Sequence, residues 1–186
     1  MVEPLGSAPV VEGVSSRRLR ALIRYWNDKR GDRPMPRRAQ IDPIEIPQLL
    51  PIVLIADVTS AGVRMRLLGT EATSAYGQET RGCLVSEIQF GEFTSFWRDA
   101  FALVAASAAP ASAGGAFRTG NLSCGVEMVL LPLTNDDVAV SQIFGGLHVR
   151  SLPLAGLFER PVPRTYIAPF ADQIDAELQR AECSGR

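Results

Sequence analysis

The sequence contains little cysteine and a single histidine. Its three cysteines, Cys83, Cys124 and Cys183, stand far apart in a chain of 186 residues. An odd and scattered set does not suit the disulfide framework of a small secreted domain, so we expect reduced thiols and a cytoplasmic protein. The N-terminus lacks the basic and apolar segments of an export signal. No apolar run approaches the ~20 residues of a membrane-spanning helix, so we expect no membrane association.

Several motifs of common enzyme classes are also missing, namely the Gly-rich phosphate loop, HExxH and CxxC. One enzyme alternative stays open, in which Cys83 or Cys124 acts as a nucleophile with His148 as its base. We favour a structural role for that histidine and expect no catalysis. Asp136 and Asp137 lie in a predicted turn without further ligands nearby, so we expect them to be solvated and not to bind a metal.

Charge is present but unevenly distributed. The net charge is −1, yet residues 17–38 hold nine basic residues and only two acidic ones. Such a segment is either the solvated face of a helix or a surface for an anionic partner, for example nucleic acid or a nucleotide. We favour the solvated face, because few aromatic residues are interleaved and no nucleic-acid-binding motif is present.

The N-terminal part predicts one amphipathic helix. Residues 1–14 have no periodic pattern and are expected to be disordered. A helix then runs from Ser15 or Ser16, as its N-cap, to about Lys29. Its apolar residues follow the spacing i, i+3, i+4 and i+7: Leu19, Leu22, Ile23 and Trp26. This stripe is our candidate interface for a homodimer, and the alternative is that it covers the protein's own sheet.

Residues 40–51, QIDPIEIPQLLP, place two acids among three prolines. Asp42 suits an N-cap, Pro43 suits the first helical position, and Glu45 lies where a capping residue reaches back. Pro47 would clash inside a longer helix. We therefore predict a helix of about one and a half turns, with the acids as caps and not as a catalytic pair.

The remainder predicts strands around one long helix. Period-two or buried apolar patterns mark five strands, at residues 52–57, 63–69, 116–122, 126–133 and 138–149. A short helix is expected over 70–76, and aromatic residues at helical spacing predict a long helix over 91–107. Ala, Gly and Ser predict a linker over 108–115. The domain would thus span residues 15–150, followed by a proline-rich extension (151–186) with a last helix over 170–181.

This order of elements resembles the PAS domain, an α+β fold in which a five-stranded antiparallel sheet carries helices on one face. Short motifs resemble those of small bacterial proteins that consist of a single PAS domain: Tyr25-Trp26, Met35-Pro36, Ile41-Asp42-Pro43, Leu49-Leu50-Pro51 and Arg66-Leu67-Leu68-Gly69-Thr70. The resemblance covers residues 16–150. It implies a sensory or regulatory module that binds a signalling partner without turnover.

PAS domains can hold haem, flavin or a small metabolite between the sheet and the helices. His148 is not on the long helix, from which haem ligands of PAS domains usually come, and Val85 stands where the reactive cysteine of flavin-binding PAS domains would be. We therefore expect no cofactor. A metabolite pocket would be lined by Met65, Leu67, Tyr76, Trp97 and Gln142, with Val63, Arg66 and Ser141 beside them. The alternative, which we favour, is a fully packed core.

Overall fold

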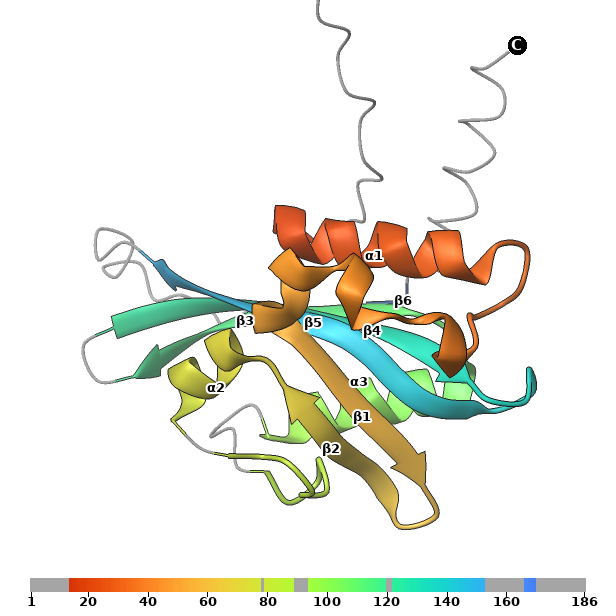
Figure 1. The fold of residues 1–186 in the computed structure, drawn as a ribbon. Coiled ribbons are helices and arrows are strands. Elements are labelled where there is room, and N and C mark those ends of the chain that lie inside the picture. Colours follow the sequence, from red (N-terminus) through yellow and green to blue (C-terminus); the bar gives the residue numbers. More distant parts are fainter. Residues whose placement is uncertain (1–13, 78, 89–93, 120–121, 153–165, 170–186) are drawn as a thin grey trace, which may run out of the picture.

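The structure, a computed structural model, describes residues 14–77, 79–88, 94–119, 122–152 and 166–169. Six antiparallel strands form one sheet: β1 (Val53–Thr59), β2 (Gly62–Leu68), β3 (Ala111–Thr119), β4 (Leu122–Thr134), β5 (Val140–Leu152) and β6 (Tyr166–Pro169). Their order is β2-β1-β5-β4-β3-β6. Helix α1 (Arg17–Arg30) covers one face of this sheet and α3 (Thr94–Ser107) the other, while α2 (Thr70–Tyr76) follows β2 (Figure 1). The expected α+β class with an antiparallel sheet is confirmed.

Helix α1 begins and ends as its local sequence predicts. The Ser16 hydroxyl caps the helix by accepting from the Leu19 N–H at 3.5 Å, and Gly31 ends it with a φ of 56°. The apolar stripe of Leu19, Leu22, Ile23 and Trp26 is fully buried against the chain's own sheet. The indole N–H of Trp26 donates to the Pro132 carbonyl at 2.9 Å. The stripe therefore covers the protein's own sheet, and these four side chains are not available to a partner in this arrangement.

The proline-rich segment forms three short 3₁₀ helices and no α-helix: η1 (Arg38–Gln40), η2 (Pro43–Glu45) and η3 (Pro47–Ile52). Asp42 is the predicted cap and accepts from the Ile44 N–H at 2.9 Å. Glu45 does not reach back to cap the helix, because it pairs with Lys29 at 2.7 Å. Tight 3₁₀ turns suit this sequence because each proline interrupts the hydrogen-bond pattern of a longer helix.

The predicted linker over 108–115 is wrong in its larger part. Residues from Ala111 onward form β3, which pairs with β4 on one side and with β6 on the other. Ala111, Ser112 and Ala113 are buried there, so tertiary pairing outweighs their weak intrinsic preference for strands. The sixth strand, β6, lies in the extension that was expected to be irregular. The predicted helix over 170–181 and residues 1–13 lie outside the described residues, whereas Val14, the last residue of the segment expected to be disordered, is buried.

The register of the sheet fixes which side chains face α1. On β4 and β5, opposite residues share a face: Glu127 with His148, Val129 with Gly146, Leu131 with Phe144, and Leu133 with Gln142. Phe144 contacts Tyr25 of α1 edge to face, with ring centroids 6.3 Å apart. Because side chains alternate along a strand, Ile143 and Leu147 point to the opposite face, toward α3.

The outer edge of β2 is covered by residues 82–85. The Met65 N–H donates to the Cys83 carbonyl at 2.9 Å, and the Met65 carbonyl accepts from the Gly82 N–H at 2.7 Å. The Val85 N–H donates to the Val63 carbonyl at 2.8 Å. The segment that follows α2 thus pairs with β2 like a short further strand. Across the described parts of the chain, no helix has the length and apolar character to span a membrane.

Candidate functional site

The structure separates the residues that we expected to line one pocket. Met65 and Trp97 are buried on the face covered by α3. Leu67 is half-buried on the other face, because a register shift places it opposite Ile55, which pairs with Phe144. Gln142 lies on the face covered by α1, because it is two residues from Phe144 on the same strand. The side chain of Tyr76 lies outside the described part of the structure. The expected grouping of Gln142 with Met65 and Trp97 is therefore corrected.

Gln142 belongs to a different polar group. Its side-chain Nε2 donates to the Asp57 carboxylate at 2.5 Å, and Asp57 in turn lies 3.6 Å from the Arg66 guanidinium. The other amide atom, Oε1, is buried and has no partner among the described residues. This group ties β5 to β1 and β2 on the side away from α3.

The layer between the sheet and α3 is packed with large side chains where we expected a pocket. Met65, Trp97, Phe101 and Ile143 are each at most 4% exposed. The small residue Ala100 is also fully buried and lets α3 approach closely. At this place the described residues fit the packed core that we favoured.

A hollow of about 420 Å³ lies farther out, between the β1–β2 hairpin and α3. Buried Val85 and Phe101 lie at its inner side, and Val58 and Val63 contribute from the hairpin. The other lining residues are mostly small or polar: Thr59, Gly62, Ser86, Arg98, Ala102, Ala105 and Ala106. Its size is within the ~300–1,000 Å³ range of small-molecule sites.

The hollow carries one charge. Among the described lining residues, Arg98 is the only charged one and none is acidic. The Arg98 guanidinium contacts the neighbouring Asp99 carboxylate at 3.2 Å, but these side chains are 54% and 60% exposed. An ion pair this exposed is weak, so Arg98 can exchange this carboxylate for another at little cost. The hollow thus combines an apolar inner surface with a cation at its rim.

The sequence held a signal for this hollow that we did not use. Arg98, Ala102 and Ala105 follow each other at i, i+4 and i+7, so they share one side of α3. That side lies beside the buried stripe of Trp97 and Val104 and presents methyl groups where larger residues would fill the space. The opposite wall comes from the hairpin, which is distant in sequence and cannot be placed from periodicity alone.

A second polar cluster joins α1, α2 and β5. Glu71 accepts from the Arg18 guanidinium at 2.6 Å and contacts the His148 Nδ1 atom at 2.8 Å. The Arg18 guanidinium also lies 3.0 Å from the same Nδ1 atom, so the three side chains form one cluster. Burial acts to raise the pKa of Glu71, but the hydrogen bonds from Arg18 and His148 outweigh it and hold this pKa below its ordinary value. Glu71 is therefore ionised at neutral pH.

Glu127 lies opposite His148 in the sheet and anchors the start of α1. Its carboxylate accepts from the backbone N–H groups of Ser15 at 2.9 Å and Ser16 at 2.8 Å, and also from the Ser15 hydroxyl. Backbone N–H groups at the start of a helix lack partners within the helix, and a carboxylate there is favourable. This cluster has a positioning role for α1.

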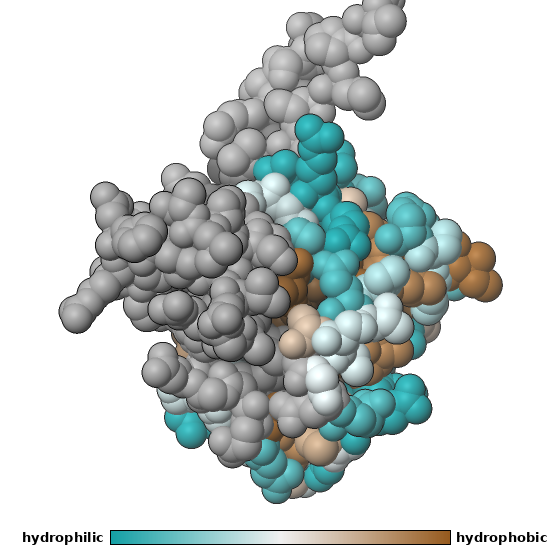
Figure 2. Space-filling model, turned by 90° about the vertical axis from the view of Figure 1, so that its left-hand side faces the viewer, coloured by the Kyte–Doolittle hydropathy of each residue, from teal (hydrophilic) through white to brown (hydrophobic). Residues whose placement is uncertain are grey.

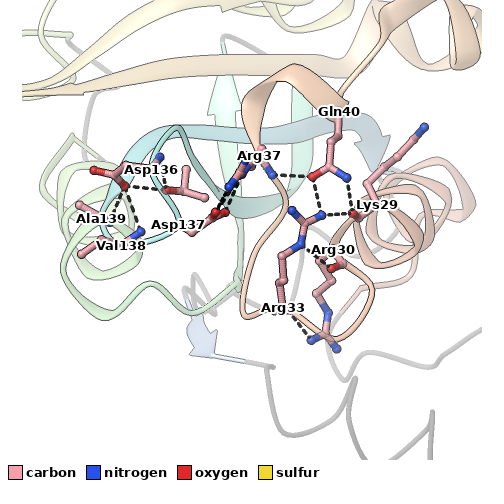
Figure 3. Close-up of polar contacts among 10 residues, drawn as sticks. Lys29, Arg30, Arg33, Arg37, Gln40, Asp136, Asp137, Val138 and Ala139 are labelled. Atoms are coloured by element: carbon pink, nitrogen blue, oxygen red, sulfur yellow. Dashed lines mark hydrogen bonds and ion pairs between the residues drawn. The ribbon is translucent and has the colours of Figure 1, made fainter.

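Most of the basic segment is engaged in bonds within the chain. Arg33 donates to the Gln40 side chain at 2.5 Å, and Gln40 also accepts from the Arg37 N–H at 2.9 Å (Figure 3). Arg37 pairs with Asp137 of the β4–β5 turn and so holds the pKa of that carboxyl below its usual range. Asp136 closes the turn by accepting from the N–H groups of Val138 and Ala139.

The same holds for other basic residues: Arg18 pairs with Glu71, Arg20 donates to the Val14 carbonyl, Lys29 pairs with Glu45, Arg30 donates to Asn27 and Arg38 donates to the Ile41 carbonyl. Arg17 and Arg24 are exposed on the outer side of α1 and have no partner among the described residues. Most of the basic side chains are thus bonded within the chain, and the structure adds no specific support for the nucleic-acid alternative.

The structure separates Cys83 from His148, one of the two pairs of the thiol alternative. Cys83 lies at the outer edge of β2, whereas His148 lies on β5, with β1 between these two strands. The His148 Nδ1 atom contacts Glu71 and Arg18. The side chain of Cys124 and all of Cys183 lie outside the described residues. Among the residues that are described, no group of three or more His, Cys, Asp or Glu side chains could hold a metal ion.

Comparison with known protein families matches residues 14–148 to the PAS domain. No curated protein and no solved structure matches the chain. The matched range begins just before α1 and ends on β5, so it includes the α1 cover, the β1–β2 hairpin, the hollow and α3. The antiparallel sheet and the helices packed on it agree with this match. The chain belongs to the PAS domain family.

Proposed function

We propose that this chain is a sensory or regulatory module that acts by binding protein, through self-association to a homodimer and through a signalling partner. Family membership supports the general role, because PAS domains serve sensing and regulation. The observation that carries the proposal is an exposed apolar surface on the 3₁₀ segment. Ile44 is 84% exposed and Leu50 is 41% exposed. Pro43, Pro47 and Pro51 are exposed beside them.

This surface is suited to binding because its backbone is fixed. Prolines at the first positions of η2 and η3 restrict the backbone torsions. The Tyr25 hydroxyl donates to the Asp42 carbonyl at 3.1 Å and accepts from the Asp42 N–H at 2.8 Å, which ties the segment to α1. A rigid apolar surface loses little conformational entropy when it binds. Figure 2 shows hydrophobic residues exposed beside hydrophilic ones along the right-hand side of its view.

Native mass spectrometry of the purified full chain tests this proposal, because it reports the oligomeric state and any retained small molecule together. We expect a dimer whose population falls in Ile44→Arg. Val138→Arg is the matched control, because Val138 is 81% exposed but lies on the β4–β5 turn. A monomeric wild type, or an equal loss of dimer in both variants, would contradict the proposal.

A further inference from the structure

The hollow between the β1–β2 hairpin and α3 has the size to accept a small ligand. Its lining comes from β1, β2, residues 85–86 and α3, which are four separate segments of the chain. A molecule bound there would contact all four and favour one arrangement of them. We propose that the hollow binds a free carboxylic acid with an aliphatic body, and that Arg98 takes the carboxylate.

Shape and polarity of the lining define the aliphatic part of this ligand. Phe101 and Val85 are buried and offer apolar contact at the inner side, and Val58 and Val63 continue this surface along the hairpin. Burial of a methylene group contributes ~0.8 kcal/mol, so a chain of several methylenes gains more here than a compact polar molecule. The three alanines of α3 leave the space into which such a chain fits.

The charge of the lining defines the polar end of the ligand. Among the described lining residues there is a guanidinium and no carboxylate, so the lining favours an anion over a cation. The guanidinium presents parallel N–H donors that match the two oxygens of a carboxylate. The Ser86 hydroxyl is exposed at the rim and has no partner among the described residues, so it can donate a further hydrogen bond.

The expectation that the ligand biases partner binding rests on the proposed regulatory function. The site itself stands on the geometry of the hollow. Thr59 donates its hydroxyl to the Gly62 carbonyl at 2.7 Å and thereby fixes the hairpin turn at one end of the hollow. Residues 82–85 are held on β2 by backbone hydrogen bonds, so both walls are in place before a ligand arrives.

Isothermal titration of the purified full chain tests the ligand class with three probes. Decanoate carries both features, decanol lacks the charge and succinate lacks the aliphatic body. We expect decanoate to bind with one molecule per chain, and decanol to bind about fivefold more weakly because an exposed ion pair contributes up to ~1 kcal/mol. Succinate should not bind. Equal binding of decanol and decanoate, or no binding of decanoate, would overturn the ligand class.

Two variants locate the site. Ala102→Phe places a ring in the hollow from an exposed helix position and should weaken decanoate about tenfold or more, the cost of displacing two buried methylenes. Arg98→Met should weaken decanoate about fivefold and leave decanol unchanged. The matched controls are Ala75→Phe, at an exposed position of α2, and Arg17→Met, at the exposed start of α1.

Thermal unfolding of each variant shows that it is folded, and the substituted positions are exposed in the wild type. If the controls weaken decanoate as much as the hollow variants do, the site is elsewhere and the proposal is wrong. That result would leave the partner-binding proposal intact, because the Ile44→Arg comparison measures oligomeric state without ligand. If decanoate binds in the hollow but does not change the population of the dimer, only the inferred effect of the ligand on partner binding is wrong.

Discussion

The two faces of the sheet are covered in different ways. On one face, α1 is held by a buried apolar stripe and by polar contacts along its length, from Glu127 at its start to the bond between Trp26 and Pro132. On the other, α3 packs with Trp97 and Phe101 but leaves a hollow beside its alanines. A closed face stabilises the fold, whereas a face with an open hollow can bind a further molecule.

The largest effect is expected on the closed face. Trp26→Ala removes a fully buried indole and leaves the Pro132 carbonyl without its donor, so we expect a loss of about 3–5 kcal/mol in the free energy of unfolding. Val63→Ala, at the half-buried wall of the hollow, should cost only about 1 kcal/mol. Urea unfolding followed by fluorescence measures both values. Similar losses would mean that the two faces are equally packed.

Two adjacent glycines of β5 sharpen the comparison. A Cβ at Gly145 would meet the Val129 carbonyl of the neighbouring strand, and backbone cannot easily move away. A Cβ at Gly146 would meet the side-chain ends of Leu19 and Leu22 in α1, which can shift. We expect Gly145→Ala to cost about 1–3 kcal/mol and Gly146→Ala less than about 1 kcal/mol. Thermal melts of the two variants give the order, and the reverse order would show that α1 cannot adjust.

The polar cluster at the start of α1 should make this face sensitive to acid. The pKa of Glu71 is lower in the folded chain than its ordinary value of 4.5, so its contribution is complete above that value and is lost as the pH falls through the folded pKa. Glu71→Gln should therefore flatten the decline of stability below about pH 4.5. Chemical denaturation at several pH values measures the slope. An unchanged slope would assign the acid sensitivity to other carboxylates.

The smallest effect on stability is expected where the segment after α1 contacts the β4–β5 turn. Arg37 and Asp137 form an ion pair that is largely exposed to solvent. Because water and salt screen such a pair, Arg37→Met should leave the midpoint of urea unfolding unchanged within error. A clear shift would indicate that the contact between the N-terminal segment and the β4–β5 turn contributes to closure of this face.

Local signals in the sequence predict the closed face well. The cap at Ser16, the spacing of Leu19, Leu22, Ile23 and Trp26, and the turn at Asp136 each depend on residues close together in the chain. The first part of β3 was missed because Ala111 to Gly115 have little preference for strands, and only pairing with β4 and β6 makes them part of one.

The hollow could not be predicted for a related reason. Its walls are Val63 on the hairpin and Ala102 on α3, far apart in the sequence, and the space between them depends on side chains that are too small to fill it. Gln142 was assigned to the wrong face because alternation along a strand shows that two faces exist without showing which helix covers each.

The pairing of residues 82–85 with β2 has a consequence for how copies of this chain can meet. An open outer strand is a template on which another chain can add a strand, and repeated addition leads to fibrils. Here the N–H and carbonyl groups of Met65 and the Val63 carbonyl are already bonded to that segment. Copies must therefore associate through side-chain surfaces on this side of the molecule, and polymerisation by backbone pairing is blocked there.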